Sequence, residues 1–240
     1  MSVFPLLLTK LVYFQEGLQL NLYLLANIIV CALAFIGFVY GATKFFGAKK
    51  ALYGQMITFA ILCVVVGRIF NVSRLITGGD IIGRFQLGTL ATIGSFIFFF
   101  SSNFGALDSI VDDGSDGFKK YRRIAVIAPL IVLAAYFPLF YVGDTALVWK
   151  VQGAVLALFA SWSSYYHLKH LIIPDVDFGV VKSLRPYNFL ALCYVASSMT
   201  EFFALSRNNE VLTLVSCSCS AVVALLMIPL ISYGLKKSSM

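Results

Sequence analysis

Residues 52–76 read LYGQMITFAILCVVVGRIFNVSRLI, a stretch whose only charged residues are Arg68 and Arg74. At a rise of about 1.5 Å per residue, a helix of this length crosses the roughly 30 Å hydrocarbon core of a bilayer. The chain holds further stretches of the same character, and each should be helical because an open strand would leave backbone groups unpaired in lipid. We predict an all-α bundle of seven transmembrane helices at residues 18–43, 52–76, 82–104, 124–142, 146–169, 187–206 and 211–234.

The composition of the 240 residues agrees with this interpretation, since 60% are hydrophobic and 12% are charged. A soluble domain carries about 45–50% apolar and about 25% charged residues. This shortage of charge argues against a soluble enzyme, a disordered protein and a DNA-binding domain, so no nucleic acid is expected as a partner despite the net charge of +7. The segments between the spans are short, and we expect residues 1–240 to form a single membrane domain surrounded by lipid.

The distribution of lysine and arginine predicts the orientation. Of the 18 basic residues, twelve lie after spans one, three, five and seven, five lie at the opposite ends of the spans, and Arg68 lies within a span. Basic residues accumulate on the cytoplasmic side of membrane proteins. We therefore expect an inner-membrane protein with its N-terminus outside and its C-terminus in the cytoplasm.

Two span ends are similar at a separation of 133 residues. Arg68-Ile-Phe-Asn-Val-Ser-Arg74 matches Glu201-Phe-Phe-Ala-Leu-Ser-Arg207 at the phenylalanine, the serine and the final arginine. The match suggests parallel repeats, spans one to three and five to seven, joined by span four. The alternative is a chance similarity between two apolar helices.

This 3+1+3 layout resembles that of the sugar-transporting SWEET proteins, and the seven spans resemble those of the microbial rhodopsins. The resemblance is one of layout. Span 211–234 contains no lysine that could bind retinal as a Schiff base, and the proline motifs of the PQ-loop and SWEET families are not evident.

Arg68 and Glu201 are the two charged residues that lie inside predicted spans and away from the span ends, and both lie six residues before a terminal arginine. Ionisable residues within a span are costly and mark candidate sites. We expect the two to pair at equal depth and to form a binding site for a small molecule or ion between spans two, three, five and six. The other side chains assigned to this site are Asn71, Gln86, Gln152, Tyr194, Ser197 and Ser198. The alternative is an ion pair that only clamps spans two and six together.

No catalytic motif, cofactor site or metal site is expected. His167 and His170, with Asp175 and Asp177 nearby, could hold zinc, but no third histidine exists and an ordinary basic loop explains them better. Trp149 and Lys150 are interpreted as interface anchors. Gly37 and Gly41, and a stripe of small residues that begins at Gly88, are expected to permit close helix packing within or between protomers.

Three functions remain open. The first is a small-solute transporter or permease-like carrier with an outward-facing polar site. The second is a seven-helix receptor or sensor that signals to a cytoplasmic partner through loops 105–123 and 170–186. The third is a structural or assembly subunit of a membrane complex, and a homo-oligomer is compatible with each.

Overall fold

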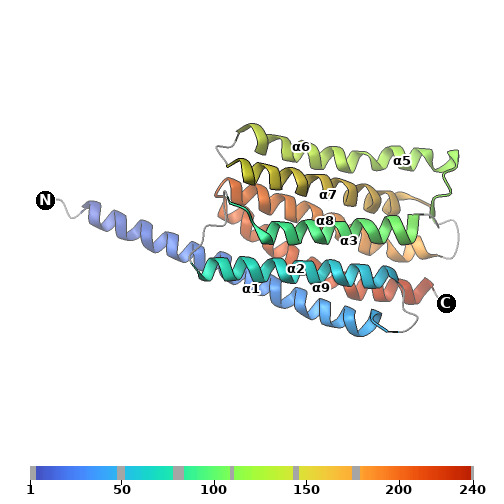
Figure 1. Cartoon of the computed structure of the whole chain (residues 1–240), viewed down its shortest axis with the longest axis horizontal. Helices are drawn as coiled ribbons and strands as arrows, with labels where there is room; N and C mark the ends of the chain where they lie inside the picture. The colour runs from blue at the N-terminus through green and yellow to red at the C-terminus, as the bar shows by residue number, and fades with distance from the viewer. Residues whose placement is uncertain are drawn as a thin grey trace.

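The computed structural model describes residues 4–47, 52–77, 84–108, 111–142, 146–174 and 179–238, and each regular element in these ranges is a helix. Figure 1 shows the helices running alongside one another, with the first part of α1 projecting beyond the bundle. The elements are α1 (Phe4–Phe45), α2 (Leu52–Ile76), α3 (Leu87–Asn103), η1 (Phe104–Asp108), η2 (Asp116–Phe118), α5 (Lys119–Ala125), α6 (Ile127–Val142), α7 (Leu147–Ile172), α8 (Val180–Ser206) and α9 (Glu210–Ser238).

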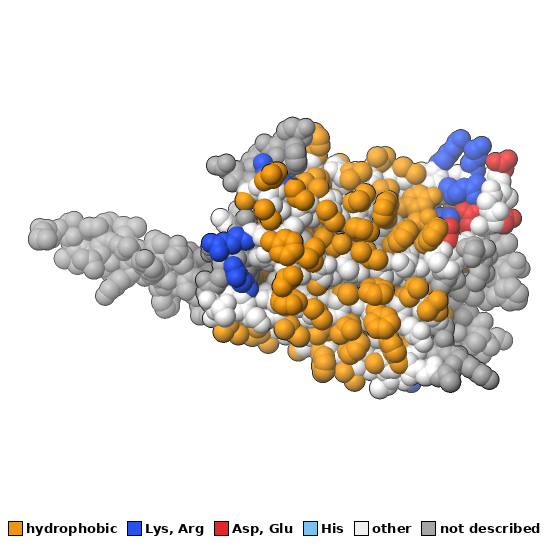
Figure 2. Space-filling model, in the orientation of Figure 1, with side chains coloured by type: hydrophobic (Ala, Val, Ile, Leu, Met, Phe, Trp, Pro, Cys, Tyr) orange, Lys and Arg blue, Asp and Glu red, His pale blue; other side chains and the backbone are white. Residues whose placement is uncertain are grey.

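Five helical stretches of the described chain are long and apolar enough to cross a membrane: Leu22–Phe45, Leu52–Ile76, Asp116–Pro138, Val181–Ser206 and Glu210–Lys236. A shorter apolar helix, α3, has 17 residues. Figure 2 shows hydrophobic side chains covering the middle of one face, with lysine and arginine residues at both of its ends and acidic residues at one of them. The predicted class, an all-helical integral membrane protein, is confirmed, while the seven-span count remains a prediction.

Six helices pack in chain order into a closed ring. α1 packs against α2, α2 against α3, α3 against α7, α7 against α8, α8 against α9, and α9 against α1. α6 lies outside this ring, against α7 and α8. The ring places α1–α3 opposite α7–α9, as a parallel repeat would, but any six helices packed in chain order would do the same, so the repeat also remains a prediction.

Small residues bring neighbouring helices of this ring together. A Cβ atom on Gly67 of α2 would lie 3.1 Å from the backbone oxygen of Gly88 on α3. A Cβ atom on Gly37 of α1 would lie 2.9 Å from the backbone oxygen of Ala224 on α9. The small residues predicted to permit close packing therefore do so within one chain.

The structure corrects the predicted boundaries at two prolines. Span four is interrupted at Val126, between α5 and α6, because Pro129 has no N–H with which to continue the helical bonds from α5. α8 begins at Val180 rather than at 187, so much of the predicted loop 170–186 is helical. Pro186 lies inside α8 near its start and removes a single helical hydrogen bond there.

Candidate functional site

The predicted pair between Arg68 of α2 and Glu201 of α8 is confirmed. Nη1 of Arg68 donates to Oε1 of Glu201 and Nη2 donates to Oε2, both at 2.6 Å. The side chains are 8% and 9% exposed. Two parallel charge-assisted bonds of this kind fix the orientation of both groups as well as neutralising them.

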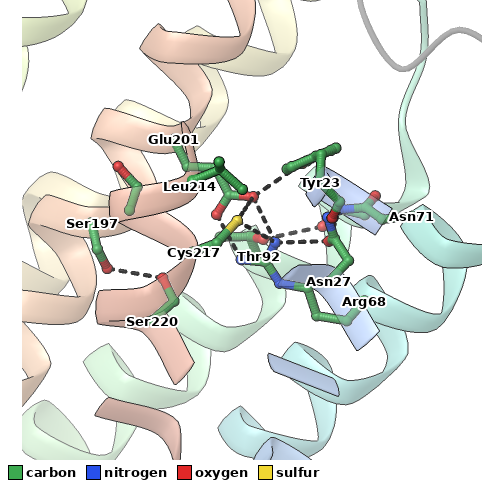
Figure 3. A network of polar contacts seen from close by, with 12 residues as sticks. Tyr23, Asn27, Arg68, Asn71, Thr92, Ser197, Glu201, Leu214, Cys217 and Ser220 are labelled. Atoms are coloured by element: carbon green, nitrogen blue, oxygen red, sulfur yellow. Dashed lines mark hydrogen bonds and ion pairs between the residues drawn. The ribbon is translucent and has the colours of Figure 1, made fainter. Parts of the chain in front are cut away.

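Helices α1 and α9 complete the surroundings of this pair (Figure 3). From α1, Tyr23 donates its hydroxyl hydrogen to Oε1 of Glu201 at 3.2 Å, and the Asn27 Oδ1 accepts from Arg68 Nη1 at 2.9 Å. From α9, the Cys217 thiol donates to Glu201 Oε1 at 3.4 Å. We call these five residues the Arg68 cluster. Because a buried ion pair is costly unless its remaining donors and acceptors are satisfied, these contacts make the pair tenable.

A cavity of about 40 Å³ lies beside the pair, between α2, α3, α7 and α8. Those four helices correspond to predicted spans two, three, five and six. A site of this volume has room for a few water molecules. Its polar lining comes from Arg68, Asn71, Gln86, Thr89, Thr92, Ser198 and Glu201, and its apolar lining includes Trp149 and Phe202.

A second hollow, of about 350 Å³, adjoins this cavity at the end of the bundle where α2 ends and α3 begins. Asn71, Gln86 and Gly88 line both hollows. Arg74 and Arg84 line only the larger one, which we call the vestibule. The shared lining residues place the vestibule directly beside the cavity that the ion pair lines.

The remaining predicted site residues divide into two groups. Asn71, Gln86 and Ser198 line the cavity. Gln152 lies next to the cavity lining, where its side chain forms two 3.2 Å hydrogen bonds with the backbone of Gln86. Tyr194 and Ser197 are absent from the cavity lining.

Tyr194 and Ser197 instead contact the neighbouring helices α3 and α9. The Tyr194 ring packs against Phe96 and Phe99, and the Ser197 hydroxyl bonds to Ser220 of α9 at 3.0 Å. Of the predicted site residues on α8, Tyr194 therefore faces α3 and Ser197 faces α9.

Trp149 corrects another expectation. Its side chain is buried and stacked on Phe202 with ring centroids 4.4 Å apart, so it forms a wall of the cavity rather than an anchor at the membrane interface.

A second polar cluster, missed by the sequence reasoning, lies toward the other end of the bundle. Tyr53 of α2 donates to the Asn103 Oδ1 at 3.0 Å, and the Asn103 Nδ2 donates to the Asn188 Oδ1 of α8 at 3.0 Å. Nδ1 of His167, on α7, lies 2.7 Å from the Asn103 Nδ2 and 2.9 Å from the Asn188 Oδ1. We call these residues, with the adjacent Tyr187, the His167 cluster. Its signal in the sequence is that Asn103, His167 and Asn188 all fall at the same end of their predicted spans.

A group of charged residues lies between the His167 cluster and the surface. Lys169 lies 2.5 Å from Asp108 and 2.7 Å from Asp112, Arg122 lies 2.7 Å from Asp112, and His170 Nε2 lies 3.2 Å from Asp108. We call these five residues the Asp108 cluster. Asp175 and Asp177, which the sequence places near the histidines, lie outside the described residues.

The two carboxyl groups of this cluster are held ionised. Burial raises the pKa of Asp108, but hydrogen bonds from His170 and Lys169 outweigh burial and leave the pKa below its ordinary value. Burial likewise raises the pKa of Asp112, and the hydrogen bonds from Lys169 and the Gly114 backbone outweigh it. Asp108 and Asp112 of the 105–123 segment are therefore bound to α7 by charge-assisted contacts.

Comparisons with protein-family models, with curated proteins and with solved structures found no match to this chain. The fold and the Arg68 cluster define its class on their own. It is an all-helical integral membrane protein with a buried ion pair next to a small polar cavity.

Proposed function

We propose that this protein is a carrier for a small solute that bears a charge, with its binding site at the cavity beside Arg68 and Glu201. The observation that carries the proposal is the position of the ion pair. The pair lines a polar cavity, and this cavity shares Asn71 and Gln86 with the vestibule. An ion pair that only clamped two helices would gain nothing from a polar cavity next to it. Intramembrane charges that face a cavity typically mark the path of a substrate or ion.

The small volume of the cavity indicates how such a carrier would work. At about 40 Å³ it admits water but no organic solute, so binding requires α2 and α3 to separate from α7 and α8. A charged solute could drive this separation by replacing one member of the pair, an anion by binding Arg68 or a cation by binding Glu201. The halves of the ring would then rock about the site, as in transporters built from repeats.

The same features support the two rivals less directly. A receptor would also use a pocket reached from the vestibule, and its signal would have to leave through the 105–123 segment, in which Asp112 is held by Lys169 and Arg122. A structural subunit would need the pair alone. Solute flux distinguishes the carrier from both rivals.

The test begins with the purified full chain in detergent and a panel of amino acids, carboxylates, amines and alkali cations. Solutes that raise its unfolding temperature are then offered as radiolabelled substrates to proteoliposomes. We expect at least one panel member to stabilise the wild type, to be taken up, and to do neither with Glu201→Gln. Ser220→Ala, which removes a buried hydroxyl outside the cavity, is the matched control and should keep both properties.

Two outcomes would overturn the proposal. One is that no panel member stabilises the wild type or enters the liposomes. The other is full uptake by the charge-swapped variant Arg68→Glu/Glu201→Arg, which would show that the pair serves only as a clamp.

A further inference from the structure

A groove of about 630 Å³ runs along the outside of the six-helix ring, between α6 and the helices α7 and α8. It is larger than the cavity beside the ion pair and larger than the vestibule, and it shares no lining residue with either. Of the described residues that line it, only Ser164 and Thr200 have a polar side chain, and the Ser164 hydroxyl donates to the Ser161 backbone oxygen at 2.9 Å. A lining of this kind suits a hydrocarbon chain.

The groove is open to the surroundings of the bundle. Small side chains leave the hollow between the helices, Ala128 and Ala135 on α6 and Ala196 on α8. Ala135 and Ala196 are exposed, and Ile131 at the edge of the groove is 63% exposed. In a membrane these residues face lipid. Since an unfilled groove would lose the dispersion contacts of its walls, hydrocarbon from the bilayer should fill it.

The length of the groove matches one leaflet of a bilayer. Its lining on α6 extends from Ala128 to Pro138, ten residues or about 15 Å at helical rise. Its lining on α8, from Leu192 to Phe203, has about the same length. The hydrocarbon core is about 30 Å thick, so the groove covers half of it, which is the depth that one acyl chain reaches. A transmembrane helix of a second copy would have to continue through the other leaflet, beyond the end of the groove.

Two basic residues of α5 lie just beyond one end of the groove. Val126, between α5 and α6, keeps a right-handed helical backbone (φ −62°, ψ −20°), so the two helices continue end to end along one edge of the bundle (Figure 1). Figure 2 shows basic side chains at the α5 end of this edge, beside the hydrophobic band. Lys120 precedes Ile131 by eleven residues, about three helical turns, which places it on the groove side. Arg123 is its neighbour on the helix surface and precedes Ala128 by about 7.5 Å, within the roughly 5–8 Å thickness of the headgroup region.

The charges around this end of the groove leave those two cations for a ligand from the membrane. The other basic residues of α5 have carboxylates beside them, since Arg122 lies 2.7 Å from Asp112 and Lys119 lies 3.6 Å from Asp116. Asp113 lies in the exposed loop that precedes α5, farther along the chain from the groove. The two cations next to the groove are both exposed, so a phosphate at the bilayer surface can reach them.

We propose that the groove is a binding site for an anionic phospholipid, with one acyl chain between α6 and α8 and the phosphate on Lys120 and Arg123. The apolar walls accept the chain of any lipid, and the two cations select the headgroup. Each basic residue near the bilayer surface strengthens the binding of an anionic lipid by about fivefold. The site lies outside the ring and shares no residue with the Arg68 cluster, so it does not depend on what the protein transports.

The headgroup part of the site can be tested by native mass spectrometry of the purified full chain in detergent. The probes are phosphatidylglycerol and phosphatidylcholine with the same two acyl chains, added in graded amounts. We expect the wild type to bind phosphatidylglycerol about tenfold more tightly or better. Lys120→Gln should weaken that binding by about fivefold and leave phosphatidylcholine unchanged. Lys119→Gln is the matched control, since it removes the same charge from another face of α5, and it should bind both lipids like the wild type.

The acyl-chain part is tested by filling the groove. Ala135→Phe should abolish the tight binding of phosphatidylglycerol, whereas Ala134→Phe, at the adjacent exposed residue outside the groove lining, should bind like the wild type. The unfolding temperature in lipid-free detergent checks that both variants are folded, and the Lys120→Gln result decides if Ala135→Phe is not.

Three outcomes would overturn the proposal. The first is equal affinity of the wild type for the two lipids, and the second is equal loss of binding in Ala134→Phe and Ala135→Phe. The third is a lipid-free dimer that Ala135→Phe dissociates, which would show that a second copy of the chain occupies the groove.

Discussion

The guanidinium of Arg68 and the carboxylate of Glu201 meet through two parallel 2.6 Å hydrogen bonds at the point where α1, α2, α8 and α9 come together. Four of the six ring helices thus contribute to one electrostatic contact, and α3 and α7 supply the cavity beside it. This arrangement ties the stability of the ring to the state of the site. A solute that separates the two charges would change the packing of the whole bundle.

The energetic coupling of this pair can be measured by a double-mutant cycle. Removing one partner leaves the other charge buried and unpaired, so Arg68→Met and Glu201→Gln should each destabilise the protein by about 3–5 kcal/mol. Combining the two substitutions should cost much less than the sum, because no isolated charge remains. Reversible unfolding in mixed micelles provides the free energies. Additive losses would mean that the two groups do not interact, contrary to the structure.

Gly88 permits the close approach of α2 and α3 beside the site. A Cβ atom there would lie 2.1 Å from the Asn71 Oδ1, so Gly88→Ala must displace the Asn71 side chain, which lines both the cavity and the vestibule. Because Asn71 is the movable end of this contact, we expect a modest loss of stability, about 1 kcal/mol, and a large loss of solute binding.

Gly105→Ala is the matched control for that substitution, since nothing lies within 4 Å of a Cβ atom there. Its stability and binding should equal those of the wild type. If Gly88→Ala also binds like the wild type, Asn71 does not contribute to the site.

The Asp108 cluster predicts a loss of stability in acid. The folded-state pKa of Asp108 and Asp112 lies below the ordinary value, so their ionised forms stabilise the folded state. That contribution is complete above the ordinary pKa of about 3.9 and is lost as the pH falls toward the lower folded value. We expect the unfolding temperature to drop between about pH 5 and pH 3.

Asp112→Asn isolates this effect. It should lower the stability near pH 7 by about 1–3 kcal/mol, because it removes the buried contact with Lys169 as well as the partly exposed contact with Arg122, and it should reduce the drop in acid. An acid profile identical to that of the wild type would show that Asp112 does not contribute.

The fold followed from the sequence where apolar length alone decides it, as in α2, whose predicted and observed bounds both run from 52 to 76. Boundaries were missed where a proline lies inside or beside a helix. Pro186 stands within α8 at a cost of one hydrogen bond, and Pro129 interrupts a span that hydropathy treats as continuous. Hydropathy measures transfer to lipid and does not respond to either effect.

The candidate site was predictable in part for a similar reason. Charges are so costly in a span that Arg68 and Glu201 had to be partners or line a cavity. Tyr23, Asn27 and Cys217 were missed because hydroxyl, amide and thiol groups are cheap enough to occur anywhere in a span. The sequence of α1 is apolar on all sides, so it does not show which face of the helix packs against the bundle. The contacts of Tyr23 and Asn27 could therefore not be assigned before the structure was known.

The orientation predicted from the basic residues can be tested by labelling. Lys119, Lys120, Arg122 and Arg123 lie together on α5, and we expect this end of the bundle to face the cytoplasm and the turn at Asn208 to face outward. In a chain whose five cysteines are replaced by alanine or serine, Ser115→Cys and Asn208→Cys each introduce one exposed thiol.

A maleimide that cannot cross membranes should label Asn208→Cys in intact cells and Ser115→Cys only after the cells are opened. Labelling of the opposite pattern would place the vestibule in the cytoplasm. The ion pair and the cavity would be unaffected by that result, but the carrier would then take up its solute from the cytoplasmic side.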